Sequence, residues 1–226
     1  MEHLVDVVLL FEGHRQHALR MLRAVKNRFG STSELGLFAM NGDGLEAVPD
    51  PSRLLLAERP QGAAGSVIVA ALEGSRPLLV EVQALLVRAA GPPRRVVTGM
   101  DPDRVALVLA VVERVTGIAA AGMDAYFKIT GGVNVEDPAI DLGIAAAAVS
   151  SVRAVPVAAD WVLVGEVGLT GDLRQVPRIP ERLREAEVLG FRRALVPGRH
   201  PEVAGALGVH RAQRLEAALA LLGLEG

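Results

Sequence analysis

Short runs of consecutive apolar residues, separated by turn residues, dominate the first 50 positions of the chain. Residues 4–11 form a nearly continuous apolar run, which is typical of a buried strand. Strand-like runs also cover residues 18–25 and 35–40, and the latter ends at a strong turn signal, Asn41-Gly42-Asp43-Gly44. Three strands without covering helices make an incomplete domain, so we expect residues 1–57 to be the end of a larger one.

From residue 58 onward the pattern alternates between strand-like and helix-like segments. Asp101 followed by Pro102 predicts a helix start, because aspartate caps the first amide groups and proline fits the first helical position. The alternation predicts an α+β domain with a mixed sheet over residues 58–226. The strands are expected at 66–72, 78–86, 94–98, 126–130, 133–135 and 161–167, and the later helices at 138–152, 179–189 and 213–222.

Composition narrows the classes of function. Half of the residues are hydrophobic but only 3% are aromatic, so the core must be aliphatic. The net charge of -2 gives no global attraction to nucleic acid, and any such contact must come from a local patch. The absence of cysteine excludes disulfides, thiolate zinc sites and a cysteine nucleophile. No run is long enough to span a bilayer and no basic leader opens the chain, so we expect a cytoplasmic protein.

Three stretches, in this order, carry a resemblance to a known family. They are Lys26-Asn27-Arg28-Phe29-Gly30, Thr98-Gly99-Met100-Asp101 and Gly165-Glu166-Val167-Gly168-Leu169-Thr170-Gly171. The chain resembles the bacterial RadA (Sms) family of recombination proteins over about residues 2 to 200. The first stretch matches the KNRFG motif at the end of that family's RecA-like ATPase core, and the other two match the Lon-protease-like domain that follows it.

The resemblance implies a fold and a biological setting. The fold would be of the Lon protease C-terminal type, also called the ribosomal protein S5 domain 2 type, preceded by the terminal strands of a RecA-like core. The family implies homo-hexameric rings that bind single- or double-stranded DNA without sequence specificity, with RecA as a further partner. The full-length protein would be an ATP-dependent motor for DNA branch migration in repair and recombination.

Cofactors implied for the full-length family member are not expected in this chain. ATP and Mg would need a Gly-x-x-x-x-Gly-Lys-Ser/Thr loop and Zn a cysteine cluster, and the sequence has neither. His14 and His17 have a metal-like spacing but no third ligand nearby, so we expect no metal site.

The protease chemistry of the Lon type is expected to be lost. That chemistry needs a serine nucleophile with a lysine base, because a serine hydroxyl is inert unless a nearby base accepts its proton. The resemblance places Asp141 at the serine position and Pro180 at the lysine position. Lys128 could not rescue the pair without a serine at the helix start. We interpret Asp141 as a carboxylate favoured by a helix N-terminus.

The KNRFG motif (Lys26, Asn27, Arg28, Phe29 and Gly30) is the next candidate site. The resemblance implies that it responds to the nucleotide state of a neighbouring subunit. From the residues alone, it would be a solvated strand end before a glycine turn.

Two arginine pairs are the candidates for DNA contact, Arg94-Arg95 and Arg192-Arg193, with Arg104 one turn into the helix that follows the first pair. Arginine suits forked hydrogen bonding to phosphate. The scarcity of aromatic residues favours contact with the DNA backbone over base stacking. Alternatively, these arginines solvate a face or pair with Glu and Asp.

The sequence therefore predicts a non-enzymatic domain for DNA binding and ring assembly. Two alternatives remain open: an oligomerisation scaffold that never touches DNA, and a domain with residual Lon-type peptidase activity.

Overall fold

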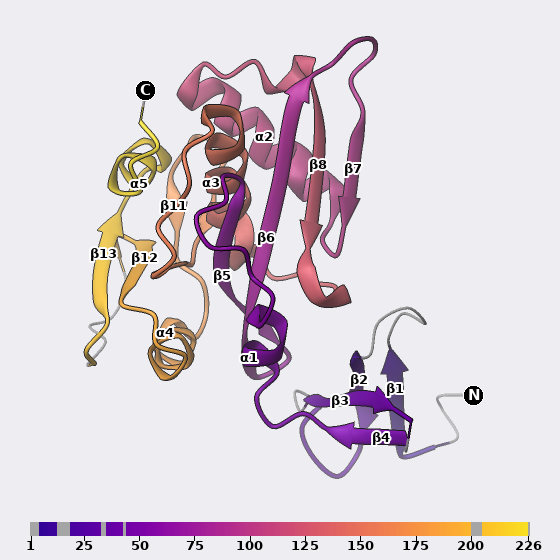
Figure 1. Ribbon diagram of the computed structural model, residues 1–226. Helices are drawn as coiled ribbons and strands as arrows, with labels where there is room; N and C mark the ends of the chain where they lie inside the picture. The colour runs from indigo at the N-terminus through magenta and orange to yellow at the C-terminus, as the bar shows by residue number, and fades with distance from the viewer. Residues whose placement is uncertain (1–4, 13–18, 33–34, 43, 200–204, 226) are drawn as a thin grey trace.

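A computed structural model of the chain describes residues 5–12, 19–32, 35–42, 44–199 and 205–225 (Figure 1). His14 and His17 lie outside these ranges. A small antiparallel sheet comes first, with the order β1-β2-β3-β4, and Figure 1 shows it beside the main body, next to α1. Its strands are β1 (Val7–Glu12), β2 (Leu19–Asn27), β3 (Leu35–Asn41) and β4 (Gly44–Ala47).

The main body is built on a seven-stranded mixed sheet with the order β13-β12-β9-β5-β6-β8-β7. Among these strands only β6 runs antiparallel to its neighbours. The strands are β5 (Ser66–Glu73), β6 (Arg76–Arg88), β7 (Arg95–Thr98), β8 (Met123–Ile129), β9 (Trp161–Leu163), β12 (Arg193–Pro197) and β13 (Gly208–Ala212), and a separate hairpin pairs β10 (Glu166–Val167) with β11 (Leu173–Arg174).

Helices cover the sheet unevenly. α3 packs on β5 and β6 and is backed by α2, while α4 packs on the same two strands from the other side and α1 packs on β6 (Figure 1). The helices are α1 (Pro51–Leu56), α2 (Pro102–Thr116), α3 (Asp141–Arg153), α4 (Ile179–Val188) and α5 (Leu215–Leu221), with 3-10 turns η2 (Ala120–Gly122), η3 (Thr130–Gly132) and η4 (Pro138–Ile140).

Strand β5 divides its side chains between two cores, because successive residues of a strand point to opposite faces. Val67 and Val69 join the core under α3, whereas Ile68 and Ala70 join the core under α4. Helix α3 approaches the sheet so closely that a Cβ on Gly143 would lie 2.1 Å from Cγ1 of Val69. Glycine is therefore required at position 143, and every residue from 141 to 150 is buried.

The predicted mixture of helices with a mixed sheet is confirmed. The predicted strand at 133–135 is wrong, since only Val135 forms a bridge, with Met100. The domain boundary near residue 57 stays a prediction. Residues 51–56, which lie before that boundary, form helix α1, and this helix packs against β6 of the larger sheet. No helix in the described part of the chain is long and apolar enough to cross a membrane.

A buried ion pair joins α4 to the centre of the sheet. The side chain of Arg182 is 1% exposed and pairs with Asp137, which directly precedes η4. Arg182 also donates to the carbonyl oxygens of Ala70 (2.7 Å) and Pro177 (2.9 Å). The Asp137 carboxylate accepts the N–H of Leu72 (2.7 Å) as well. Both charges are thus paired and hydrogen-bonded, as burial of a charge requires.

We expect Arg182→Met to lower the free energy of unfolding by about 3 to 5 kcal/mol, because it leaves the Asp137 carboxylate buried without its cation. Urea titration followed by circular dichroism measures this loss. Arg174→Met is the matched control, since Arg174 forms an exposed pair with Asp172 and should cost less than about 1 kcal/mol. Equal losses in the two variants would show that the buried pair does not organise the fold.

Candidate functional site

The position expected for a protease nucleophile holds a buried and paired carboxylate. Asp141 is the first residue of α3, and its side chain is 3% exposed. Nη1 of Arg104, from α2, lies 3.0 Å from Oδ1 and 3.1 Å from Oδ2. The N–H of Val167 donates to Oδ2 at 3.2 Å. The carboxylate thus ties α3 to α2 and to the β10 hairpin, and does not cap its own helix.

Burial raises the pKa of Asp141 to about 6, although the hydrogen bond and the charge of Arg104 oppose that rise. A buried carboxylate that already accepts a guanidinium and a backbone amide offers no free nucleophile. The helix-start interpretation of Asp141 was incomplete, because it did not include Arg104, a residue 37 positions away.

The position expected for the lysine base is occupied by Pro180, the second residue of α4. Proline is well suited there, since its missing N–H falls in the helical turn that has no acceptor for it. α4 packs against β5 and β6, whereas Asp141 is surrounded by α2 and β10. The geometry contains no serine-lysine pair at these two positions.

The predicted DNA-contacting arginines fall into two groups. Arg94, Arg95 and Arg192 are exposed, and Arg94 is bonded through its backbone N–H to Asp124 (2.7 Å). Arg104 is instead engaged by Asp141. Arg193 is engaged by Asp160, and its guanidinium lies 4.6 Å from the centre of the Trp161 ring.

The ion pair between Arg193 and Asp160 shifts the pKa of both groups. Its side-chain hydrogen bond lowers the pKa of Asp160 and raises the pKa of Arg193 itself, so both groups stay charged. The pairing is sterically specific because Nε donates to one carboxylate oxygen at 2.8 Å and Nη2 donates to the other. Arg193 thus holds the start of β12, and Arg192 is the residue of this pair that faces solvent.

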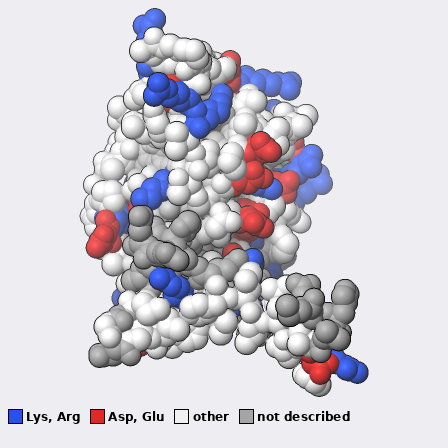
Figure 2. Space-filling view, turned by 90° about the vertical axis from the view of Figure 1, so that its right-hand side faces the viewer, with Lys and Arg blue, Asp and Glu red and all other residues white. Residues whose placement is uncertain are grey.

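The two arginine pairs do not form one patch on a single chain. β7 and β12 are separated in the sheet by β8, β6, β5 and β9, which corresponds to roughly 24 Å of sheet. Figure 2 views the molecule from the side of β7 in Figure 1 and shows Lys and Arg side chains gathered around the upper end of this face. Sequence reasoning missed a third exposed arginine, Arg88, at the end of β6 opposite the start of β8.

Comparison with known proteins identifies the family. The chain is 50% identical over 201 residues to DNA repair protein RadA of Halalkalibacterium halodurans, covering 88% of this chain and 44% of that protein. It is 51% identical over 198 residues to DNA repair protein RadA of Bacillus subtilis, covering 87% and 43%. The corresponding protein of Listeria monocytogenes is 49% identical over 198 residues, with the same coverage. This chain belongs to the RadA family.

The chain spans less than half the length of the RadA relatives that it matches. A family model described as subunit ChlI of Mg-chelatase also matches residues 130–200, a stretch that includes α3, the β10 hairpin and α4.

The KNRFG motif of this RadA chain forms a turn at the end of β2 that is fastened to the residues before β1. Lys26 Nζ donates to the carbonyl oxygen of Val5 (2.7 Å), and Arg28 Nη1 donates to Asp6 (3.0 Å). Oδ1 of Asn27 accepts the N–H of Phe29 (3.0 Å), and the Phe29 side chain projects with 78% exposure. An exposed phenylalanine on a fastened turn is suited to contact a neighbouring surface. The motif's response to the nucleotide state of a neighbouring subunit stays a prediction.

The raised pKa of Asp141 predicts a specific pH dependence of stability. The native state retains a proton on Asp141 up to about pH 6, whereas the unfolded state loses it near 3.8. This residue's contribution therefore grows more favourable as the pH falls from about 6 to about 4, by up to about 3 kcal/mol. Urea unfolding between pH 4 and 7 measures the free energy of unfolding of the unaltered chain and of Asp141→Asn. The value for the unaltered chain minus that for the variant should fall as the pH rises. A constant difference would contradict the assignment.

The neighbouring arginines of the β12 pair should behave differently. Arg193→Ala removes the contacts with Asp160 and Trp161 and should cost about 1 kcal/mol of stability. It should also change the emission of Trp161, the single tryptophan. Arg192→Ala should leave stability within about 0.5 kcal/mol, because its side chain is exposed. Urea unfolding monitored by tryptophan fluorescence compares the two variants. Equal losses of stability would show that Arg193 is no more engaged than Arg192.

Proposed function

We propose that this chain is the DNA-contacting and ring-forming part of a RadA-type DNA repair and recombination protein. The observation that carries the proposal is its 50% identity, over 88% of its length, to a protein named DNA repair protein RadA. The exposed arginines around the start of β7, Arg88, Arg94 and Arg95, supply the local positive charge that a chain of net charge -2 needs for DNA contact.

The proposed fold is that of an inactive Lon-protease-like domain. The helix of small residues, α3, begins at the buried Asp141, and α4 follows the β10 hairpin with Pro180 in its first turn. A serine nucleophile at position 141 would need a free base beside it, and the Arg104 guanidinium lies there instead. Proteolysis is therefore not part of the proposed function.

Ring assembly would make weak DNA contacts useful. A homo-hexamer repeats each exposed arginine around its axis, and linked contacts bind more tightly than any one of them alone. For the whole protein the proposal extends to an ATP-dependent motor for DNA branch migration in the cytoplasm. ATP, Mg and Zn would be held by parts outside this chain, and RecA is the proposed protein partner.

DNA binding should depend on the arginines at the start of β7. We expect Arg94→Ala/Arg95→Ala to weaken binding of single- and double-stranded DNA alike. Each lost phosphate contact should reduce the slope of log K against log[salt] by about 1. Fluorescence anisotropy with labelled DNA over a series of salt concentrations measures both quantities.

Arg114→Ala is the matched control, because Arg114 is an exposed arginine on α2, distant in sequence from both pairs. It should leave the salt slope unchanged. If Arg94→Ala/Arg95→Ala binds DNA as the unaltered chain does, with the same assembly state by sedimentation, then these residues do not contact DNA. If every arginine variant binds DNA as the unaltered chain does, the alternative of an oligomerisation scaffold without DNA contact is favoured.

A further inference from the structure

Within the described residues, no helix covers one face of the large sheet at the end formed by β6, β8 and β7 (Figure 1). On β6, Ala84 and Leu86 point into the core under α3, whereas Gln83 and Leu85 point to the opposite side. Leu85 is 55% exposed, and Val96 of β7 is 49% exposed. A sheet face with exposed apolar side chains of this size is a surface that a ligand can cover.

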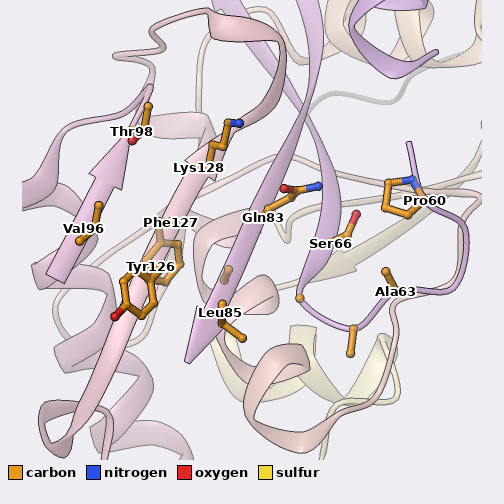
Figure 3. A pocket seen from close by; sticks show the side chains of 13 residues that line it. Pro60, Ala63, Ser66, Gln83, Leu85, Val96, Thr98, Tyr126, Phe127 and Lys128 are labelled. Carbon is orange, nitrogen blue, oxygen red and sulfur yellow. The ribbon is translucent and has the colours of Figure 1, made fainter. Parts of the chain in front are cut away.

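A cavity of about 440 Å³ opens on this face (Figure 3). The strand register arranges its floor in two rows. The apolar row is Leu85, Tyr126 and Val96, and the polar row beside it is Gln83, Lys128 and Thr98. The segment before β5, with Pro60 and Ala63, forms the far wall in Figure 3. The volume is within the range of small-molecule sites.

The charge of this cavity is positive. No carboxylate lines it, and Lys128 is the ammonium group among its lining residues. In the described part of the chain, no acidic group lies within 4.0 Å of Lys128 Nζ. The nearby buried Glu81 accepts hydrogen bonds from Ser66 and from Nε2 of Gln83, which leaves the amide oxygen of Gln83 as an acceptor.

Further along the same face lie the cation Arg94 and the carboxylate Asp124, which accepts the backbone N–H of Arg94. Arg94 lies four residues before Thr98, on the side of β7 that also carries Val96. The step from the polar row to Arg94 is roughly 13 Å, with Tyr126 between the two. An aromatic ring between two cations matches a nucleic acid strand, in which phosphates flank each base.

We infer that this cavity takes one unstacked base of a single DNA strand, with the base on the ring of Tyr126 and a phosphate at Lys128. The inference rests on the proposed function, because it specifies which DNA the domain contacts and where. A duplex cannot use such a site, since its bases are stacked inside the helix and do not offer a free face. Gln83 and Thr98 present polar atoms to the edge of the base, and Leu85 and Val96 exclude water around its ring.

A protein partner fits these observations less well. A second copy of this chain would have to place an acidic or polar side chain against Lys128 and a bulky group in the cavity. The combination of an aromatic floor, a free cation and an acceptor is the set that recognises a nucleotide. Tyr126 is also the chain's only tyrosine, so a DNA crosslink to a tyrosine can only be to this residue.

The test compares Tyr126→Leu with Tyr126→Phe in the 226-residue chain, using a labelled oligothymidine and a labelled duplex in anisotropy titrations. Tyr126→Leu should weaken single-strand binding by at least about fivefold, because it removes the stacking surface. Tyr126→Phe keeps that surface and should bind as the unaltered chain does. Neither variant should change duplex binding.

Two further measurements keep the inference independent of folding defects. Irradiation of the unaltered chain with an oligothymidine that carries 5-iododeoxyuridine should attach the DNA to Tyr126, as located by mass spectrometry of the peptides. Lys128→Gln should reduce the single-strand salt slope by about 0.7, whereas Arg114→Gln, the control on the α2 side, should not.

Equal oligothymidine affinity for Tyr126→Leu and the unaltered chain, or attachment only elsewhere, would overturn the inference. If Arg94→Ala/Arg95→Ala still weakens all DNA binding in that case, the proposed function stands and only the base site fails. A chain that binds no DNA fails both proposals. If Tyr126→Leu changes the sedimentation of the chain but not its DNA binding, the face is a contact between copies and the inference is wrong.

Discussion

Two buried carboxylates four residues apart fix the segment on which the rest of the domain depends. Asp137 and Asp141 flank the short turn η4, and each is paired with an arginine from a different helix. Arg182 reaches Asp137 from α4, and Arg104 reaches Asp141 from α2. A buried charge is tolerated only with its partner and its hydrogen bonds in place. The start of α3 is therefore locked to α2, to the sheet and, through Asp137, to α4 on the other side of the sheet.

This lock explains why the start of α3 serves as a structural element in this chain. An active serine at that position would need an unpaired base beside it, and here the space contains the Arg104 guanidinium and the N–H of Val167. Exposed chemistry is found elsewhere, on the arginines at the start of β7 and on the uncovered sheet face that carries Tyr126 and Lys128. We therefore assign a structural role to the frame, meaning the two ion pairs at Asp137 and Asp141, and assign ligand binding to the uncovered sheet face.

Local signals predicted much of the fold. Asp101 and Pro102 place the start of α2 correctly, and the apolar runs locate β1, β5 and β6 to within a few residues. β4 and α1 were missed because both are short, with four and six residues, and α1 is held by contacts with β6 and by a hydrogen bond from Ser52 to Glu185 of α4. The resemblance to the RadA family placed Asp141 and Pro180 near helix starts, and the structure has both residues in the first turn of a helix.

The partners of charged residues could not be predicted in the same way. Arg104 and Arg193 look like any surface arginine in the sequence, and only the packing of distant segments shows that Asp141 and Asp160 engage them. The uncovered face was invisible for the same reason, since Leu85, Tyr126 and Val96 become neighbours only through the registers of β6, β8 and β7. Pairing across a sheet is a long-range property that local pattern does not encode.

Amide hydrogen exchange of the chain with and without single-stranded DNA tests the central claim most directly, because it reports the frame and the ligand surface together. The account predicts that DNA slows exchange in β7, in β8 and in the neighbouring part of β6. It predicts no change at residues 137–145, which the two ion pairs already protect. Slowed exchange centred on the start of α3, with β7 and β8 unaffected, would contradict it.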